Sequence, residues 1–267
     1  TTYLPVGEEG LVDPADVARA VRPTTILITL MHANNEVGTV QPIAEISRIA
    51  RKHGIVMHTD AAQSVGKMPT DVEELGVDLL SVAGHKVYAP KGIGALYVRA
   101  PLMPEKFCYG AGQEMGWRGG TENVLEIVGL GKACEIAQRD LEKHMARMKF
   151  LRDRLHEGLL GRIPNIRLNG DLQHRLPNTL SISFKGQEAN RILEDIGLEV
   201  AASAGAACHA DSVEVSHVLE AMGIPLEWAQ GTLRFSVGRM TTEAEIDETI
   251  RVVAEAVNPN PDNLSRS

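Results

Sequence analysis

The stretch "LLSVAGHKVYAPKGIGALYV", residues 79–98, has two apolar runs separated by a polar, glycine-rich turn. Residues 79–83 and 93–98 have the length and apolar character of buried strands. Lys86 comes shortly after the first run. A lysine at the end of a buried strand can be a solvated charge, an anion ligand or a nucleophilic amine, and the rest of the chain decides between these roles.

Upstream of this stretch, short apolar runs alternate with amphipathic helical patterns. The patterns predict strands at 26–30 and 55–59 and helices at 13–21, 42–54 and 71–75. Strands separated by helices are typical of parallel βαβ units, in which ligands bind at the carboxyl ends of the strands. Asn35, Asp60 and Lys86 each follow a predicted strand, so we expect them to line one crevice.

The second half of the chain has a different pattern, typical of an α+β domain. One long helix is expected over residues 122–160. The other expected elements are strands at 166–168, 180–184 and 233–238, helices at 188–196, 214–222 and after a capping box at Thr242 and Glu245, and a small-residue loop at 201–211. We therefore expect two domains, residues 1–142 and 143–267, with a disordered polar tail from residue 258.

Composition excludes several classes of protein. The 27 Lys and Arg against 35 Asp and Glu give a formal charge of −8, which argues against a nucleic-acid-binding protein. No apolar run approaches the roughly 18 residues of a membrane helix. Cys108, Cys134 and Cys208 lack CxxC spacing, which favours free thiols in a reducing compartment over a disulfide framework or a zinc site.

Four polar residues near strand ends are candidates for cofactor binding. Asp60 is either a helix N-cap or the partner of a pyridine nitrogen, which a carboxylate keeps protonated, as with pyridoxal phosphate. Gln63 is either a surface amide or a donor to the phenolic oxygen of the same ring. Asn35 either makes a turn or binds a cofactor hydroxyl or a substrate carboxylate. His85 is either a surface histidine or a ligand of a phosphate or a ring.

Two residues in the second half are candidates for substrate chemistry. Cys208 lies among Ser, Gly and Ala in a loop expected to be mobile, where an accessible thiol with a lowered pKa is a nucleophile. Cys108 and Cys134 are expected to be buried and inert. Arg234, inside a strand pattern, is either a clamp for a carboxylate or half of an internal salt bridge.

The glycine-dense segment at residues 110–123, "GAGQEMGWRGGTEN", lacks the P-loop pattern and does not follow the first strand of a βαβ unit. It is therefore not expected to bind a nucleotide. A loop that reaches a neighbouring subunit fits this composition better, with Arg118 and Thr121 as its polar groups, although a plain surface loop is the alternative.

Six stretches together resemble one protein family, in its order and at about its spacing. The family is the cysteine desulfurases, class-V aminotransferase-like enzymes of pyridoxal-phosphate fold type I. The stretches are "MHANNEVGTVQPI" (31–43), "HTDAAQSVGK" (58–67), "GHKVYAPKGIGALYV" (84–98), "RGGTEN" (118–123), "SAGAAC" (203–208) and "LRFSVGR" (233–239). The resemblance extends over essentially the whole chain. It implies an α/β large domain with a mostly parallel sheet, followed by a smaller α+β domain that carries the catalytic cysteine.

The resemblance implies a reaction in which L-cysteine gives L-alanine and a persulfide on Cys208. Lys86 would hold pyridoxal 5′-phosphate covalently and then move the Cα proton, while Cys208 attacks the substrate sulfur. A sulfur-acceptor protein would collect the persulfide sulfur, in iron–sulfur cluster assembly. The enzyme would be a cytoplasmic homodimer.

The resemblance also implies the remaining contacts of cofactor and substrate. Asp60 would pair with the pyridine nitrogen. The other contacts would be Gln63 to the ring hydroxyl, Asn35 to the same region and the substrate, His85 to the phosphate, Thr121 to the phosphate of the partner subunit and Arg234 to the substrate carboxylate.

The chain departs from the family pattern in two ways. Ala83 stands where the family has a phosphate-binding serine, so one phosphate contact is expected to be lost or moved. Family members are also longer, so the large domain is expected to begin at a strand, residues 1–6, without the family's phosphate-binding threonine segment and ring-stacking histidine. The alternatives are a selenocysteine lyase, an aminotransferase, and an inactive fragment or scaffold without a complete cofactor site.

Overall fold

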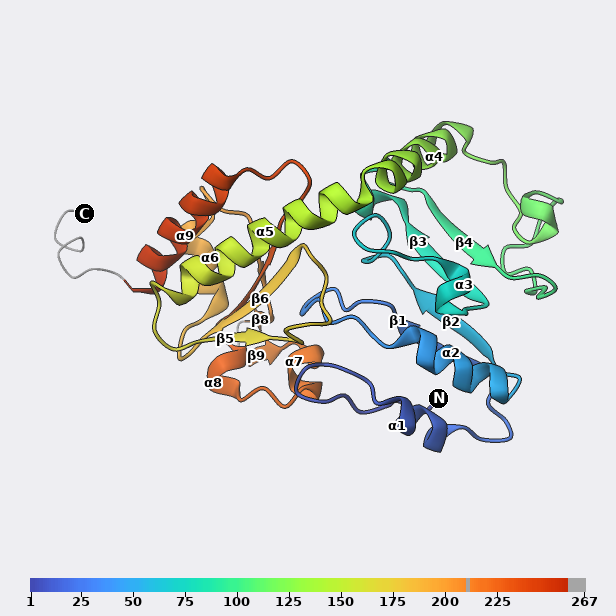
Figure 1. Ribbon diagram of the computed structural model, residues 1–267, viewed down its shortest axis with the longest axis horizontal. Coiled ribbons are helices and arrows are strands. Elements are labelled where there is room, and N and C mark those ends of the chain that lie inside the picture. The colour runs from blue at the N-terminus through green and yellow to red at the C-terminus, as the bar shows by residue number, and fades with distance from the viewer. Residues whose placement is uncertain (210–211, 259–267) are drawn as a thin grey trace. The chain divides into compact units, whose positions relative to one another are not determined.

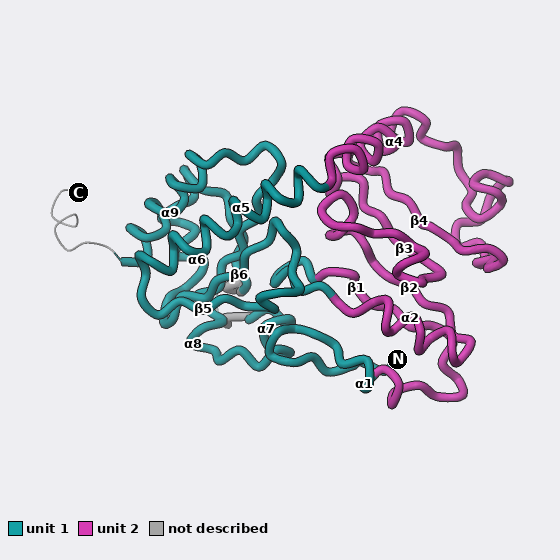
Figure 2. Tube along the Cα trace, in the orientation of Figure 1, with its two compact units in different colours: residues 1–16, 34–40, 142–267 teal, residues 17–33, 41–141 magenta. Residues whose placement is uncertain are grey.

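A computed structural model of the protein describes residues 1–209 and 212–258 (Figure 1), without the side chains of residues 206–209 and 212–214. Most of the tail that is expected to be disordered lies outside these residues. The chain divides into two compact units (Figure 2). Unit 1 comprises residues 1–16, 34–40 and 142–267, and unit 2 comprises residues 17–33 and 41–141.

This division differs from the expected first domain, 1–142, because two early segments belong to unit 1. Thr39 links the early segments to the second half of the chain. Its hydroxyl donates a hydrogen bond to the carbonyl oxygen of Glu9 (2.7 Å) and accepts one from the amide of Asp171 (3.2 Å). Val6 and Val37 also pack with Leu219 and other apolar residues near the C-terminus. These contacts join residues far apart in the sequence.

Unit 2 contains a mixed sheet in the order β1-β2-β3-β4. Its strands are β1 (Leu27–Met31), β2 (Val56–Asp60), β3 (Leu79–Ala83) and β4 (Gly94–Val98). The first three are parallel, whereas β4 runs antiparallel to β3. Two glycines allow the backbones of β3 and β4 to approach closely. A Cβ on Gly94 would lie 2.6 Å from the carbonyl oxygen of Val82, and a Cβ on Gly84 would lie 2.7 Å from the carbonyl oxygen of Ile93.

The first three helices begin and end close to the expected residues. They are α1 (Pro14–Ala20), α2 (Ile43–Lys52) and α3 (Val72–Leu75). Two 3₁₀ turns, at Gly84–Lys86 and Glu114–Gly116, precede the next helix, α4 (Val124–Arg139). The single helix expected over 122–160 is two helices, α4 and α5 (Leu141–Leu160). The break falls at Asp140, a residue type whose side chain favours helix ends over helix interiors.

Unit 1 contains an antiparallel sheet in the order β5-β6-β10-β7. Its strands are β5 (Ile166–Asn169), β6 (Thr179–Phe184), β10 (Thr232–Ser236) and β7 (Ser203–Ala204). α5, α6 (Ala189–Ile196) and α9 (Glu243–Val257) supply apolar side chains to one core with this sheet (Figure 1). All six residues of β6 are buried. The expected capping box of Thr242 and Glu245 starts α9.

Two local predictions are wrong. Residues 1–6 form no strand, because no strand of the described residues pairs with them. The loop expected at 201–211 contains β7 and β8 (Ala206–His209), and β8 pairs with β9 (Ser212–Val215). The small residues allow close pairing here: a Cβ on Gly205 would lie 2.9 Å from the Thr232 side chain. Two short helices, α7 (His217–Ala221) and α8 (Leu226–Ala229), complete the unit.

Within the described ranges, 1–209 and 212–258, no helix combines the length and the apolar character needed to cross a membrane.

Candidate active site

Lys86 lies at the carboxyl end of β3, in the 3₁₀ turn that follows the strand. Its side chain is exposed, as is that of His85. The structure also gives the Lys86 ammonium no hydrogen bond or ion pair with any described residue.

Asp60 is the last residue of β2, the strand next to β3 in the sheet, and its Cα pairs with that of Ser81. Its Oδ1 accepts a hydrogen bond from the amide of Ala62 at 2.8 Å. Asp60 is therefore not the helix N-cap considered from the sequence, because the residues after β2 form turns and not a helix. The hydrogen bond to Ala62 occupies one carboxylate oxygen and leaves Oδ2 without a hydrogen bond to the described residues, so a second role for Asp60 remains open.

Gln63 lies in the turn after β2 and is half-buried. The ammonium of Lys67 donates to its carbonyl oxygen at 2.8 Å and to its side-chain Oε1 at 3.3 Å. Burial, and then the nearby charge of Lys86, lower the pKa of Lys67 from 10.5 to about 8. Sequence reasoning missed Lys67. Its only sequence signal is the four-residue spacing from Gln63, which is common for lysines on surface turns.

Arg234 lies on β10 in unit 1 and makes no ion pair with the described residues, so the expected internal salt bridge is absent from them. Its Nη1 donates to the carbonyl oxygen of Asn35 (2.9 Å) and its Nη2 to the hydroxyl of Ser203 (3.0 Å). Its Nε is buried and has no hydrogen-bond partner there. Neutral acceptors thus orient the guanidinium without neutralising its charge, which suits an anionic ligand.

Asn35 contributes to unit 1 through its backbone. The turn expected from Asn34 and Asn35 is made by Asn34, whose Oδ1 accepts from the amides of Glu36 (2.8 Å) and Val37 (3.0 Å). The side chain of Asn35 is half-buried and takes no part in that turn. It is therefore free for the ligand role considered from the sequence.

Two histidines, His32 buried and His58 half-buried, form hydrogen bonds within and beside the strands that carry these residues. His32, which follows β1, contacts the hydroxyl of Ser64 through Nδ1 at 2.9 Å, and burial lowers its pKa from 6.5 to about 4. His58 on β2 contacts Thr29 (2.7 Å) and Ser81 (2.9 Å), on the strands at either side. Burial lowers the pKa of His58, and the charge of Asp60 opposes this. Both rings favour the neutral form.

The cysteines differ from what the sequence led us to expect. Cys108 and Cys134 are free and exposed, not buried. Cys134 lies on α4, where several apolar neighbours on the helix are also exposed, so an apolar side chain here does not imply a place in the core. The backbone of Cys208 lies in β8 opposite Val213. The thiol of Cys208 lies outside the described side chains, so the prediction of its accessibility remains a prediction.

The predicted site residues fall into two groups, one in each unit. Unit 2 carries Asp60, Gln63, His85, Lys86 and Thr121, and unit 1 carries Asn35, Cys208 and Arg234. Thr121 is exposed, in the segment before α4. Of the three residues expected to line one crevice, Asp60 and Lys86 lie at the ends of neighbouring strands of unit 2, and Asn35 belongs to unit 1.

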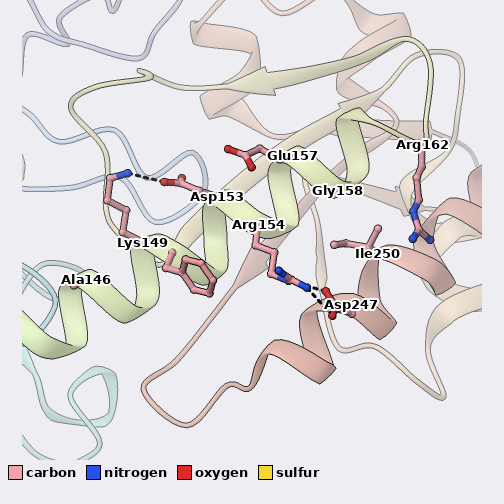
Figure 3. A pocket seen from close by; sticks show the side chains of 10 residues that line it. Ala146, Lys149, Asp153, Arg154, Glu157, Gly158, Arg162, Asp247 and Ile250 are labelled. Carbon is pink, nitrogen blue, oxygen red and sulfur yellow. Dashed lines mark hydrogen bonds and ion pairs between the residues drawn. The ribbon is translucent and has the colours of Figure 1, made fainter.

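A groove of about 750 Å³ on unit 1 contains none of the predicted site residues (Figure 3). It runs along α5 beside α9, and four of its six charged side chains form ion pairs with one another. Arg154 contacts Asp247 at 2.7 Å, and Lys149 contacts Asp153 at 2.6 Å. These ion pairs leave few free groups for a ligand. No cluster of three or more metal-binding side chains occurs among the described residues, here or elsewhere.

Comparison with known proteins gives a consistent result. Residues 1–249 match the profile of the family described as aminotransferase class-V. The cysteine desulfurase IscS of Dictyoglomus turgidum is 47% identical over 257 residues, covering 96% of this chain and 65% of that protein. The probable mitochondrial cysteine desulfurase of Dictyostelium discoideum is 47% identical over 258 residues, covering 96% and 57%. This chain therefore spans less than two thirds of the length of these relatives.

Solved structures agree with the sequence relatives. One named "NIFS-LIKE PROTEIN" matches with a TM-score of 0.87 at 36% identity, over 95% of this chain and 67% of that one. The expected α/β fold of fold type I is thereby confirmed, and its sheet is mostly parallel, since β1, β2 and β3 are parallel and β4 is antiparallel.

Proposed function

The chain belongs to the aminotransferase class-V family, and on that premise we propose that it acts as a pyridoxal-phosphate-dependent cysteine desulfurase. One observation carries the proposal. Lys86 presents an unpaired amine at the end of β3, and Asp60 ends the neighbouring strand with Oδ2 unoccupied by any described residue. The relatives named cysteine desulfurase support this choice of reaction.

The side chains of unit 2 fit the chemistry of pyridoxal 5′-phosphate. When bound, this cofactor supplies an electron sink for the electron pair left at the substrate Cα. Lys86 would hold it covalently, and Asp60 would keep the ring nitrogen protonated because opposite charges favour the cation. Gln63 would hydrogen-bond the ring oxygen, and His85 and the partner's copy of Thr121 would bind the phosphate. Asn35 of unit 1 would bind near the ring and the substrate.

Ala83 makes one phosphate contact unavailable, because its methyl group cannot donate the hydrogen bond that a serine hydroxyl supplies there. The phosphate would then depend more on His85 and on backbone amides. We propose weaker retention of the cofactor as the consequence.

Arg234 would bind the carboxylate of L-cysteine. Its Nε is a buried donor without a partner among the described residues, which a carboxylate oxygen would satisfy. The fixed positions of Nη1 and Nη2 support two parallel hydrogen bonds to the substrate. In the proposed reaction, Lys86 would take the proton from the substrate Cα.

Cys208 would act as the sulfur acceptor within the protein. Its thiolate attacks the substrate Sγ, so that an S–S bond forms while the Cβ–Sγ bond breaks. The electron pair of the broken bond is protonated on carbon, which gives L-alanine and a persulfide on Cys208. An acceptor protein would then take the terminal sulfur, and we propose iron–sulfur cluster assembly in the cytoplasm as the setting.

We propose a homodimer. Several large apolar side chains of unit 2 are exposed, and a second copy of the chain would shield them from water. They are Met103, Phe107, Tyr109, Met115, Val124, Leu125 and Val128. The same segment carries Thr121, so its burial by a second copy would bring this residue toward the phosphate of the neighbouring site.

The test is turnover of L-cysteine by the purified protein, followed as alanine and sulfide. Lys86→Ala should abolish both products together with the visible absorbance of the bound cofactor. Cys208→Ser should keep that absorbance and lose sulfide release. Sulfide production by Cys208→Ser at the wild-type rate would refute the assigned nucleophile, and a higher rate with selenocysteine than with cysteine would assign a selenocysteine lyase instead.

A further inference from the structure

We propose that Lys67 is a positioning residue that fixes the side-chain amide of Gln63 as a hydrogen-bond donor toward the cofactor ring. The inference rests on the proposed function, because it concerns the group that Gln63 would contact. It goes beyond that function in assigning a role to a lysine that neither forms the covalent link nor touches the substrate.

The geometry of Lys67 supports a fixed position. Its Nζ makes two hydrogen bonds to one residue, to the carbonyl oxygen (2.8 Å) and to Oε1 (3.3 Å) of Gln63. Its backbone amide donates to the carbonyl oxygen of Ser64 at 2.9 Å, which closes the turn between the two residues. The lysine therefore holds both the backbone and the side chain of Gln63.

The turn itself is packed against the residue next to Lys86. Gly66 has φ +73°, and a Cβ there would lie 2.7 Å from the Val87 side chain. Glycine is therefore required by the conformation and by the close approach. Val87 directly follows Lys86, so this packing brings the turn close to the segment that carries Lys86. The charge of Lys86 contributes, after burial, to the lowered pKa of Lys67.

Proton-donor chemistry decides how the amide is oriented. An ammonium group has three donors and no acceptor, so the Gln63 atom that it contacts must be the oxygen. The amide NH₂ then faces away from Lys67 and can only donate. A donor to a phenolic oxygen stabilises the ionised form of that oxygen. Without Lys67, the amide can rotate and present its oxygen instead, which would repel an ionised ring oxygen.

A spectroscopic double-mutant cycle tests this role. The visible absorbance of the bound cofactor is recorded against pH for the wild type, Lys67→Met, Gln63→Leu and the double variant. We expect Lys67→Met to raise the midpoint of the transition by roughly 0.5 to 1 pH unit, the size of one neutral hydrogen bond. Lys67→Arg, which keeps the charge and the donors, should leave the midpoint close to that of the wild type.

The decisive comparison is the Gln63→Leu background. If Lys67 acts through Gln63, Lys67→Met adds no further shift there. An equal shift of the midpoint in both backgrounds would overturn the inference, because it would assign a purely electrostatic effect of Lys67 on Lys86. An unchanged midpoint in Lys67→Met would also overturn it. If Lys67→Met does not fold, Lys67→Gln takes its place with the same two outcomes.

These results separate the inference from the proposed function. If the wild type gives no absorbance with pyridoxal 5′-phosphate, the proposed function and the inference are overturned together. If the wild type gives the absorbance and Lys86→Ala loses it, the proposed function stands, and the cycle alone decides the role of Lys67.

Discussion

Mild acid should destabilise the protein through one buried histidine, His32. Only 2% of this residue is exposed, its Nδ1 contacts Ser64, and burial lowers its pKa from 6.5 to about 4. Between these two pH values the unfolded chain binds a proton that the folded chain does not. The stability that the neutral ring confers is therefore complete above pH 6.5 and is lost as the pH falls toward 4.

The size of the effect follows from the two pKa values. With 6.5 in the unfolded chain and about 4 in the folded one, His32 alone removes about 2 kcal/mol of unfolding free energy between pH 7 and pH 5. At pH 4 the loss reaches about 3 kcal/mol. Since the ring is almost fully buried, solvent screening does not reduce these figures appreciably.

Urea denaturation at pH 7 and pH 5, followed by circular dichroism, measures this loss. The control is His32→Gln, which keeps a polar group near Ser64 but cannot titrate in this range. The variant is less stable at pH 7, yet its stability should change less with pH than that of the wild type, by about 2 kcal/mol. Equal pH dependence of the two proteins would refute the reasoning, because the other histidines and the carboxylates are common to both.

Three further predictions concern single side chains. Arg234→Gln should raise KM for L-cysteine roughly 10- to 100-fold in steady-state assays, because charged hydrogen bonds of about 1.5–3 kcal/mol are lost; an unchanged KM would contradict the clamp. Gly94→Ala should lower the unfolding free energy by about 1–3 kcal/mol in urea, because the new Cβ would lie 2.6 Å from a strand carbonyl oxygen, whereas Gly131→Ala, with open space around it, should not destabilise the protein. Thr242→Ala should cost about 1 kcal/mol through the lost cap of α9, while Thr249→Ala on the same helix should cost less.

Local signals in the sequence predicted most elements and several site positions. The Asp71 cap and the apolar face of α2 identify helices because capping and periodicity are properties of neighbouring residues. Asp60 and Lys86 could be assigned to strand ends for the same reason. Once two strands are parallel and adjacent, their carboxyl ends lie at the same edge of the sheet.

Features that depend on distant contacts could not be predicted. Residues 34–40 belong to unit 1 because Thr39 and Val37 contact the C-terminal half, which no local pattern reveals. The antiparallel course of β4 depends on close backbone contacts at Gly84 and Gly94. Lys67 has no local feature that separates it from a solvated lysine, since its importance comes from burial and from Gln63.

The exposure of Cys108 and Cys134 is another feature that local sequence patterns could not predict. An apolar helix face in a sequence predicts burial, but it does not say whether the chain itself or a second subunit covers that face. The exposed residues of α4 fit the proposed homodimer, and measurement of the mass in solution by light scattering tests this. A dimer is the expected result, and a fully active monomer would contradict it.

The central claim is that Lys86 forms the covalent link to pyridoxal 5′-phosphate. Incubation of the protein with the cofactor, reduction with borohydride, and mass spectrometry of the intact chain and its peptides test it directly. The account predicts one cofactor per chain, attached to the peptide that contains Lys86 and absent from Lys86→Ala. An unmodified chain, or a cofactor attached at Lys67 or another lysine, would contradict it.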